Sequence, residues 1–283
     1  MNGKTCIITG ATDGIGLEAA ARLGALGARL VLVGRNRAKG EAALATLHQR
    51  VPGITVEMHY ADLSRRDEVL RLAGELLAAA PRIDVLLNNA GGFFARRTLT
   101  EDGLEHTFAL NHMGYFRLTA LLRERLVASA PARIVNVASE AHRGARLDFD
   151  DLQNAKGYRG WKAYQRSKLA NILFTRALAR RLVGTGVTAN CLHPGFVATG
   201  FGDNNSGLWR WAIAAAKRVM AIPVERGAET PVYLASSPEI DGVTAKYFDQ
   251  CRERAPDAPA QDEAAAERLW AASEKLAGLP PAP

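Results

Sequence analysis

Residues 6–16, CIITGATDGIG, decide the fold of this 283-residue chain. The apolar run at their start, Cys6 to Thr9, predicts a buried strand, and the glycines that follow break it before a helical run over 17–26. A strand, a glycine turn and a helix start bring backbone N–H groups and the positive helix end up to a phosphate. The spacing Gly-x-x-x-Gly-x-Gly departs from the usual dinucleotide pattern Gly-x-Gly-x-x-Gly, so a tight turn without a ligand is the alternative.

The same alternation of strand and helix continues along the chain. Strands that alternate with helices of ordinary length imply a parallel sheet with right-handed crossovers. We therefore expect an α/β fold, a Rossmann-type doubly wound parallel sheet flanked by helices. No linker divides the chain, so residues 1–283 are expected to form a single domain. The expected strands are 29–33, 54–58, 83–87, 134–138 and 187–192, and the expected helices are 38–49, 65–80, 102–128 and the region around Tyr164 that ends before Gly184.

Composition excludes several function classes. The 36 Lys and Arg against 29 Asp and Glu give a formal net charge of +7. The excess is scattered arginine without a nucleic-acid motif, so we expect no nucleic-acid partner. The three cysteines stand far apart, which is typical of a reducing compartment and predicts no metal site. Since the sequence shows neither a secretory signal nor an apolar run long enough to span a bilayer, we expect a cytoplasmic protein.

The end of the second strand predicts which dinucleotide binds. In this topology that end faces the adenosine ribose, where an acidic residue accepts from the 2′-hydroxyl group and an arginine grips a 2′-phosphate. Here the strand ends at Gly34, which has no carboxylate, and Arg35, which has a planar guanidinium. The sequence therefore favours NADP(H) over NAD(H). The alternative is that Arg35 and Arg37 belong to a solvated loop before the next helix.

Tyr164 and Lys168 stand four residues apart in an unbroken helical pattern, so they project from the same face, one turn apart. A free phenol titrates near 10, and an adjacent cation in a partly dry cleft lowers that pKa. The pair is a candidate general acid/base device for moving a proton on or off an oxygen. The alternative is an exposed amphipathic turn. Other features fall at the carboxyl ends of the expected strands, where ligands bind in such a sheet: the glycine turn, Arg35, Asp62, Asn89, Ser139 and Pro194-Gly195.

Together these motifs resemble those of the short-chain dehydrogenase/reductase family. Within the family the likeness is to the retinol-dehydrogenase-like branch, through residues 33–36, 110–116, 135–142, 167–174, 246–249 and 266–270. Members of that branch reduce or oxidise hydrophobic carbonyl/alcohol pairs with NADP(H). The family matches run in order along the chain: Thr9-Gly10-x-x-x-Gly14-Ile15-Gly16, Asp62-Leu63, Asn88-Asn89-Ala90-Gly91, Asn111, Ser139, Tyr164-x-x-x-Lys168 and Pro194-Gly195.

The resemblance implies a catalytic set of Asn111, Ser139, Tyr164 and Lys168. Tyr164 would exchange a proton with the substrate oxygen while hydride passes to or from nicotinamide, and Lys168 would lower the pKa of the phenol. Ser139 would position the substrate oxygen, and Asn111 would hold a water that links Lys168 to solvent. The implied cofactor contacts are Gly10, Thr12, Asp13, Gly14, Ile15, Gly16, Arg35, Asn36, Asp62, Leu63, Asn89, Ala90, Gly91, Tyr164, Lys168, Pro194, Gly195, Val197 and Thr199. Because Asp13 stands where many NADPH-preferring relatives carry a basic residue, the NADP(H) prediction rests mainly on Arg35.

The resemblance also places a variable substrate lid at about 200–224 and a C-terminal extension at about 250–283. A helix over 208–222 would carry an apolar stripe on one side and basic residues on the other, with two tryptophans between. It either covers a hydrophobic substrate or lies at an anionic bilayer as a peripheral membrane contact. His142 and Arg143 follow Ser139 closely enough to line the pocket, and loop residues without substrate contact are the alternative.

We therefore expect an NADP(H)-dependent oxidoreductase that acts on a hydrophobic carbonyl compound or alcohol. One alternative is a reductase of carbon–carbon double bonds of the protochlorophyllide-reductase type. Another is a scaffold that senses NADP(H) without turnover, although a sensor has no need of the proton relay that the catalytic set implies. The helices that carry Asn111 and Tyr164 often form the dimer interface in this family, which makes a homodimer the expected assembly if the chain associates.

Overall fold

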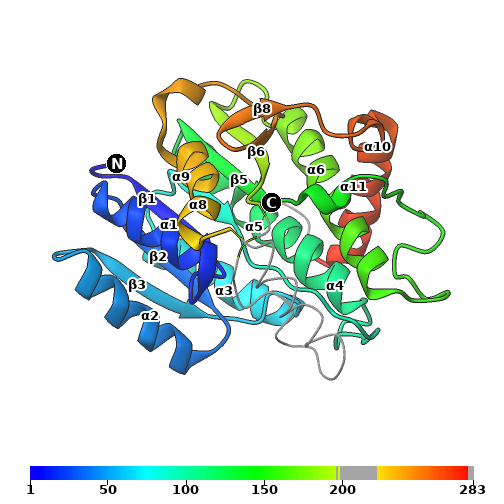
Figure 1. The fold of residues 1–283 in the computed structure, drawn as a ribbon, viewed down its shortest axis with the longest axis horizontal. Helices are drawn as coiled ribbons and strands as arrows, with labels where there is room; N and C mark the ends of the chain where they lie inside the picture. Colours follow the sequence, from blue (N-terminus) through cyan, green and yellow to red (C-terminus); the bar gives the residue numbers. More distant parts are fainter. Residues whose placement is uncertain (196, 198–221, 280–283) are drawn as a thin grey trace.

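The computed structural model describes residues 1–195, 197 and 222–279. One sheet runs through it in the order β3-β2-β1-β4-β5-β6-β7-β8 (Figure 1). The first seven strands are parallel, and β8 runs antiparallel to β7. The strand order reverses between β1 and β4, which is where ligands bind in doubly wound sheets. The strands are β1 (Thr5–Thr9), β2 (Arg29–Gly34), β3 (Val56–Tyr60), β4 (Val85–Asn88), β5 (Ala132–Val137), β6 (Val187–His193), β7 (Tyr247–Asp249) and β8 (Arg252–Arg254).

Helices cover both faces of this sheet, as the expected Rossmann-type fold requires (Figure 1). On one face α1 packs against α2 and α9, and on the other α3 packs against α5, and α6 against α11. The helices are α1 (Gly14–Ala25), α2 (Arg37–Arg50), α3 (Arg66–Ala79), α4 (His106–Phe108), α5 (Gly114–Ala128), α6 (Gly160–Arg181), α8 (Val224–Gly227), α9 (Glu229–Ser236), α10 (Ala258–Gln261) and α11 (Glu263–Ala277).

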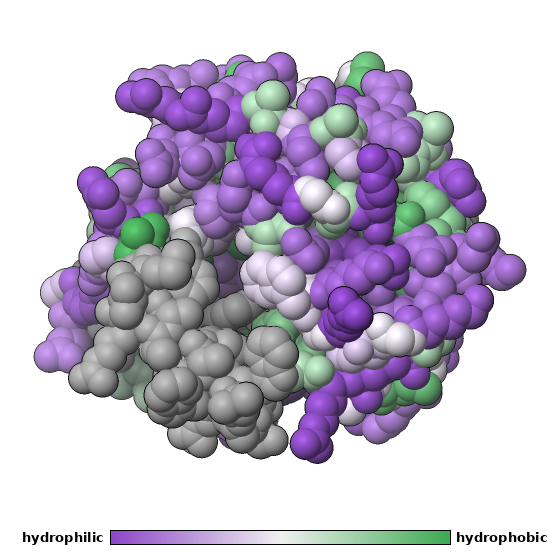
Figure 2. Space-filling model, turned by 45° about the vertical axis from the view of Figure 1, so that its right-hand side comes forward, coloured by the Kyte–Doolittle hydropathy of each residue, from purple (hydrophilic) through white to green (hydrophobic). Residues whose placement is uncertain are grey.

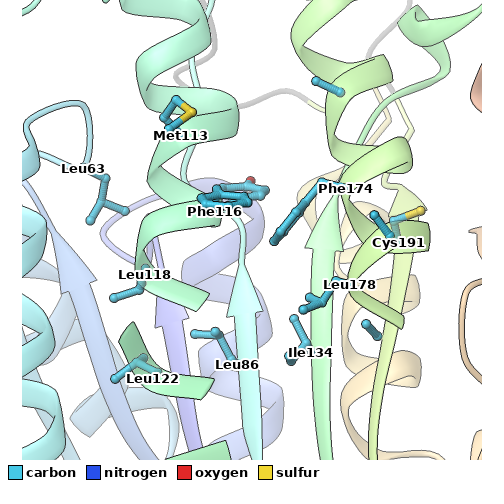
Figure 3. Close-up of a cluster of buried hydrophobic side chains, with 14 of the residues drawn as sticks. Leu63, Leu86, Met113, Phe116, Leu118, Leu122, Ile134, Phe174, Leu178 and Cys191 are labelled. Atoms are coloured by element: carbon cyan, nitrogen blue, oxygen red, sulfur yellow. The ribbon is translucent and has the colours of Figure 1, made fainter. Parts of the chain in front are cut away.

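The core divides into two layers because successive side chains of a strand point to opposite faces of the sheet. In β1, Ile7 belongs to the layer under α3, α5 and α6, whereas its neighbour Ile8 belongs to the layer under α1 and α9. Figure 3 shows the first layer, where Phe116 and Phe174 meet between α5 and α6 above the strands. This packing fixes α6, and with it the segment that carries Tyr164 and Lys168, against the sheet.

Several expected element boundaries were wrong, and three of them have a local cause. The region 102–128 is not one helix: residues 101–103 form a turn, Glu105 caps α4 by accepting from the backbone N–H groups of Thr107 and Phe108, and a π-helix over Ala109–Met113 precedes α5. Helix α1 begins three residues earlier than expected because the Asp13 side chain caps it by accepting from Gly14 N. Strand β3 begins at Val56 because Ile54 N closes a turn onto the Val51 carbonyl.

The lid expected at about 200–224 and the helix expected at 208–222 lie, up to residue 221, outside the described residues. None of the helices in the described part of the chain is both long and apolar enough to cross a bilayer. The face shown in Figure 2 is mostly hydrophilic, with apolar residues scattered over it. In a doubly wound sheet of this order, ligands bind at the carboxyl ends of the parallel strands.

Candidate active site

The ends of β1 and β4 are tied together at the point where the strand order reverses. Thr9 Oγ1 accepts from the backbone N–H groups of Asn89 and Ala90 at 2.9 and 3.1 Å. In return, Asn89 Nδ2 donates to the carbonyl oxygens of Thr9 and Gly10 at 2.8 and 3.1 Å. Asn89 therefore supports the glycine turn from below.

The glycine turn between β1 and α1 requires residues without side chains. Gly10 and Gly14 have φ values of +65° and +53°, in the left-handed region that favours glycine. A Cβ at Gly16 would lie 2.6 Å from Asn89 Nδ2 and closer still to the Gly10 carbonyl oxygen. Asp13 is exposed and its carboxylate accepts from Gly14 N at 2.7 Å. The neighbouring Thr12 and Ile15 are half-buried at the same turn.

Positive charge gathers at the end of β2. The Arg35 side chain is 62% exposed, and its Nη1 atom lies 3.4 Å from Asp62 Oδ2. Asn36 caps α2 by accepting from Lys39 N at 2.9 Å, and Lys39 Nζ lies 3.9 Å from Asp13 Oδ2. Burial raises the pKa of Asp62, but hydrogen bonds from Ser64 and the charge of Arg35 outweigh burial and hold that pKa below its ordinary value. Asp62 is therefore an anion held between β2 and β3.

Tyr164 and Lys168 lie on one face of α6, as their spacing predicts, and both are buried. The Lys168 ammonium lies 5.7 Å from the centroid of the Tyr164 ring and donates to the Val137 carbonyl at 3.1 Å. Burial lowers the pKa of Lys168 to about 7. Tyr164 forms a hydrogen bond with Ser139, which lowers its pKa, yet burial dominates and raises that pKa to about 12.

The pKa of Tyr164 corrects one expectation. The lysine was expected to bring the phenol pKa down towards neutrality, but in this structure desolvation of the phenol outweighs all other effects. The Lys168 ammonium donates to the Val137 carbonyl at 3.1 Å. At neutral pH the phenol therefore holds its proton.

Asn111 sits in the π-helix that precedes α5 and is completely buried. Its Oδ1 atom accepts from Gly92 N at 2.8 Å, and its Nδ2 atom donates to Gly92 O at 3.0 Å and to Ser167 Oγ at 2.9 Å. Gly91 separates Asn111 from Lys168: a Cβ built there would lie 3.2 Å from Asn111 Oδ1 and 3.5 Å from Lys168 Nζ. The amide thus fixes the 91–92 turn beside the lysine.

Other predicted cofactor residues follow β3 and β6. Leu63 is buried, and its carbonyl would lie 2.9 Å from a Cβ at Gly114, so it packs directly on α5. Pro194 and Gly195 follow β6, and Gly195 has a φ of +86°. Val197 is buried and pairs in a β-bridge with Ile222. Thr199, the last predicted cofactor contact, lies outside the described residues.

Two aromatic side chains beside Tyr164 were missed from the sequence. The Phe93 ring meets the Tyr164 ring edge to face, with 6.3 Å between the ring centroids. The Trp161 ring stacks on the Tyr164 ring, with 5.7 Å between the centroids and 29° between the ring planes. Trp161 is nevertheless 50% exposed. The spacing of Trp161 and Tyr164, three residues apart on a helix, is the signal that could have identified this neighbour.

The position of His142 agrees with the interpretation of a residue without substrate contact. Its side chain is fully buried under Ser139, and its Nδ1 atom lies 2.6 Å from the Ser139 carbonyl oxygen. Arg143 is exposed and forms an ion pair with Glu140 instead. Across the described ranges, no group of three or more His, Cys, Asp or Glu residues could hold a metal ion.

Comparisons with known proteins agree with this arrangement. A family model described as short chain dehydrogenase matches residues 4–207. Human retinol dehydrogenase 14 is 43% identical over 301 residues, covering 99% of this chain and 88% of the relative. Human retinol dehydrogenase 13 is 39% identical over 282 residues, covering 98% of this chain and 85% of the relative.

Solved structures give the same result for the fold. An uncharacterized protein from Mycobacterium paratuberculosis superposes with a TM-score of 0.78 at 33% identity, covering 98% of this chain and 94% of that chain. An actinorhodin polyketide ketoreductase solved with NADPH has a TM-score of 0.67 at 28% identity, covering 87% and 94%.

Proposed function

The chain belongs to the short-chain dehydrogenase family, and from this premise we propose that it is an NADP(H)-dependent enzyme that interconverts a hydrophobic carbonyl compound and its alcohol. Membership of the retinol-dehydrogenase-like branch makes it an oxidoreductase that acts on CH–OH donors. The observation that carries the proposal is the buried Tyr164 hydroxyl, which is hydrogen-bonded to Ser139 after β5, with Lys168 on the same face of α6.

The ends of β1 and β2 fit a phosphorylated dinucleotide. Gly10, Gly14 and Gly16 leave room for a pyrophosphate to approach the backbone of this turn, where the Asp13 carboxylate accepts from Gly14 N at the start of α1. Gly34 offers no carboxylate for a 2′-hydroxyl group, whereas Arg35 is mostly exposed and free to turn towards a 2′-phosphate. Lys39 lies close enough to Asp13 to offset the one carboxylate at this turn. When bound, the nicotinamide would donate or accept the hydride.

Tyr164 is suited to act as the general acid. A phenol is protonated at neutral pH, so Tyr164 can donate as negative charge develops on the substrate oxygen. Ser139 Oγ accepts from Ala141 N at 3.1 Å, so its own proton remains available for an oxygen.

Lys168 is suited to restore the proton that Tyr164 gives up. With a pKa of about 7, its amine can take up and release a proton near neutral pH. Its position is fixed by the hydrogen bond to the Val137 carbonyl, and the turn held by Asn111 lies directly beside it. We infer that proton exchange with solvent passes along this side of α6.

The walls of the site support an apolar substrate. Phe93 is buried and Trp161 half-exposed, and both rings contact the Tyr164 ring, so the surroundings of the phenol are aromatic. Apolar walls with a few polar groups at the reacting atom are the usual form of a small-molecule site. The relatives' name, retinol dehydrogenase, also describes an enzyme for a hydrophobic alcohol.

The experiment is to follow NADPH and NADH consumption by absorbance with a panel of aliphatic, aromatic and isoprenoid aldehydes and ketones. The proposal expects turnover of hydrophobic carbonyl compounds with NADPH preferred, and an alcohol as the product. Product analysis distinguishes this from reduction of a carbon–carbon double bond. Tight NADPH binding without turnover of any carbonyl compound would contradict the proposal.

A further inference from the structure

A cavity lies beside the start of α6. It has a volume of about 450 Å³ and is formed between the first two turns of that helix and the loop that follows Ser139. None of the residues that line it is acidic. The lining residues are Gly144, Ala145, Arg146, Arg159, Trp161, Lys162, Gln165 and Arg166.

Most of the positive charge in this cavity is uncompensated. Arg166 is engaged, since its Nη1 atom donates to Asn154 Oδ1 at 2.7 Å and its Nε atom to the Arg146 carbonyl at 3.1 Å. By contrast, the side chains of Arg146, Arg159 and Lys162 have no hydrogen bond or ion pair with any residue of the described ranges, and all three are exposed. Elsewhere on the surface arginine commonly meets a carboxylate, as Arg180 and Arg181 meet Glu267.

The start of α6 adds to this positive potential. The helix is 22 residues long, has no side-chain cap and carries no acidic residue in its first turn. A helix N-terminus is stabilised by negative charge, yet here Arg159 and Lys162 occupy the cap and the first turn. The three exposed cations and the uncapped helix start therefore give this cavity a positive potential, which favours an anion.

Trp161 connects this cavity to the reacting centre. Its ring lines the cavity and also stacks on the Tyr164 ring at 5.7 Å. Trp161 is therefore shared between the cavity and the surroundings of Tyr164, so an apolar segment along the indole would join a reacting carbon at Tyr164 to a charged end among the cations. An indole with half of its surface exposed suits such an apolar segment.

We propose that the cavity binds an anionic group, a carboxylate or a phosphate, at the far end of the carbonyl or alcohol substrate. This inference rests on the proposed function and deepens it: the substrate is an amphiphile with an acidic end. The arginines and the lysine supply charge-assisted hydrogen bonds to that end, and the indole selects for an apolar spacer.

The test compares decanal with 10-oxodecanoate, two aldehydes that differ in a terminal carboxylate. We expect the ratio of kcat/KM for the oxo acid to that for decanal to exceed one. We expect Lys162→Glu to lower this ratio about tenfold, the equivalent of about 1.4 kcal/mol, and Lys162→Arg to retain it. The matched control is Lys275→Glu, which reverses an exposed charge on α11 and should leave the ratio unchanged. A wild-type ratio of one or below, or equal losses for both aldehydes in Lys162→Glu, would overturn the proposal.

Two further measurements separate this inference from its alternatives. Calorimetric titration with decanoate, which has no carbonyl group to reduce, should show binding that Lys162→Glu weakens about tenfold. If decanoate binds in this way while no aldehyde is reduced, the cavity assignment stands and the proposed function fails. Co-sedimentation with phosphatidylglycerol vesicles that is lost in Lys162→Glu, together with no preference for the oxo acid, would assign the cations to a lipid headgroup and overturn the substrate proposal.

Discussion

The Nδ1 atom of His142 lies 2.6 Å from the backbone carbonyl oxygen of Ser139. Only a protonated Nδ1 can donate to that oxygen, so the ring carries its proton there. The other ring nitrogen, Nε2, lies 3.4 Å from the backbone nitrogen of Asp257, in the C-terminal extension. Because the histidine is completely buried, these contacts fix where β5 ends and where Ser139 begins its turn.

His142→Ala should therefore lower kcat about tenfold, which corresponds to about 1.4 kcal/mol of lost positioning, with a smaller change in KM. His142→Asn keeps a side-chain donor and should recover part of the loss. Steady-state kinetics with an aldehyde and NADPH measure both values, and His48→Ala, on the exposed side of α2, is the control. An unchanged kcat in a folded His142→Ala protein would show that Ser139 needs no support from this ring.

Arg35→Ala should weaken NADPH binding by about 2 kcal/mol, or roughly 30-fold, because a charge-assisted contact to the 2′-phosphate is lost. NADH binding should hardly change, since the Arg35 side chain is mostly exposed and its contact with Asp62 is long. Titration of each cofactor against intrinsic fluorescence gives both dissociation constants. Equal losses for the two cofactors would refute the assignment of Arg35.

Gly16→Ala should weaken NADPH binding by tenfold or more and destabilise the protein by about 1–3 kcal/mol. The added methyl group would collide with the Gly10 carbonyl and the Asn89 amide, which together shape the turn. Gly74→Ala is the matched control, since that helical glycine has no atom within 4 Å of the added Cβ. It should stabilise the protein by about 1 kcal/mol. Urea unfolding measures the stability of both variants. A stable Gly16→Ala protein with normal NADPH affinity would disprove the close approach of Gly16 to the Gly10 carbonyl and the Asn89 amide.

Lys168 should make the stability of the cofactor-free protein rise with pH above neutrality. Its pKa is about 7 in the folded protein and near 10.4 in an unfolded chain, so between these values the unfolded state binds more protons. The free-energy cost of burying the Lys168 ammonium in the folded protein is fully present below pH 7. It decreases as the pH rises, because the buried amine loses its proton. Relative to Lys168→Met, the wild type should gain up to about 1.4 kcal/mol per pH unit between pH 7 and 8. If the free energies of unfolding of the wild type and of Lys168→Met, measured in urea, changed with pH in parallel, that result would contradict this prediction.

Much of the fold could be predicted because its signals are local. The period of α6 puts Tyr164 and Lys168 on one face, and the alternation of strands and helices brings the glycine turn, Asn89 and Ser139 to one edge of the sheet. The π-helix at Asn111 was not predicted, because apolar periodicity does not distinguish it from an ordinary helix.

The parts that could not be predicted depend on side-chain directions and on contacts between distant segments. Lys168 turns to the Val137 carbonyl, and Tyr164 is desolvated by packing, so their pKa values could not be inferred from spacing alone. His142 is buried because a segment 115 residues further along the chain, at Asp257, closes over it. No local pattern contains that contact.

The most direct test of the proposed chemistry is the rate of NADPH oxidation with a hydrophobic aldehyde, measured for the wild type, Tyr164→Phe and Tyr233→Phe. Tyr233 lies on α9, and its hydroxyl meets only Glu239 among the residues that the structure describes. Because general acid catalysis contributes about 10²–10⁴-fold, we predict a loss of that size in Tyr164→Phe, with NADPH binding retained, and no loss in Tyr233→Phe. A Tyr164→Phe enzyme that turns over at the wild-type rate would contradict the assignment of Tyr164 as the proton donor.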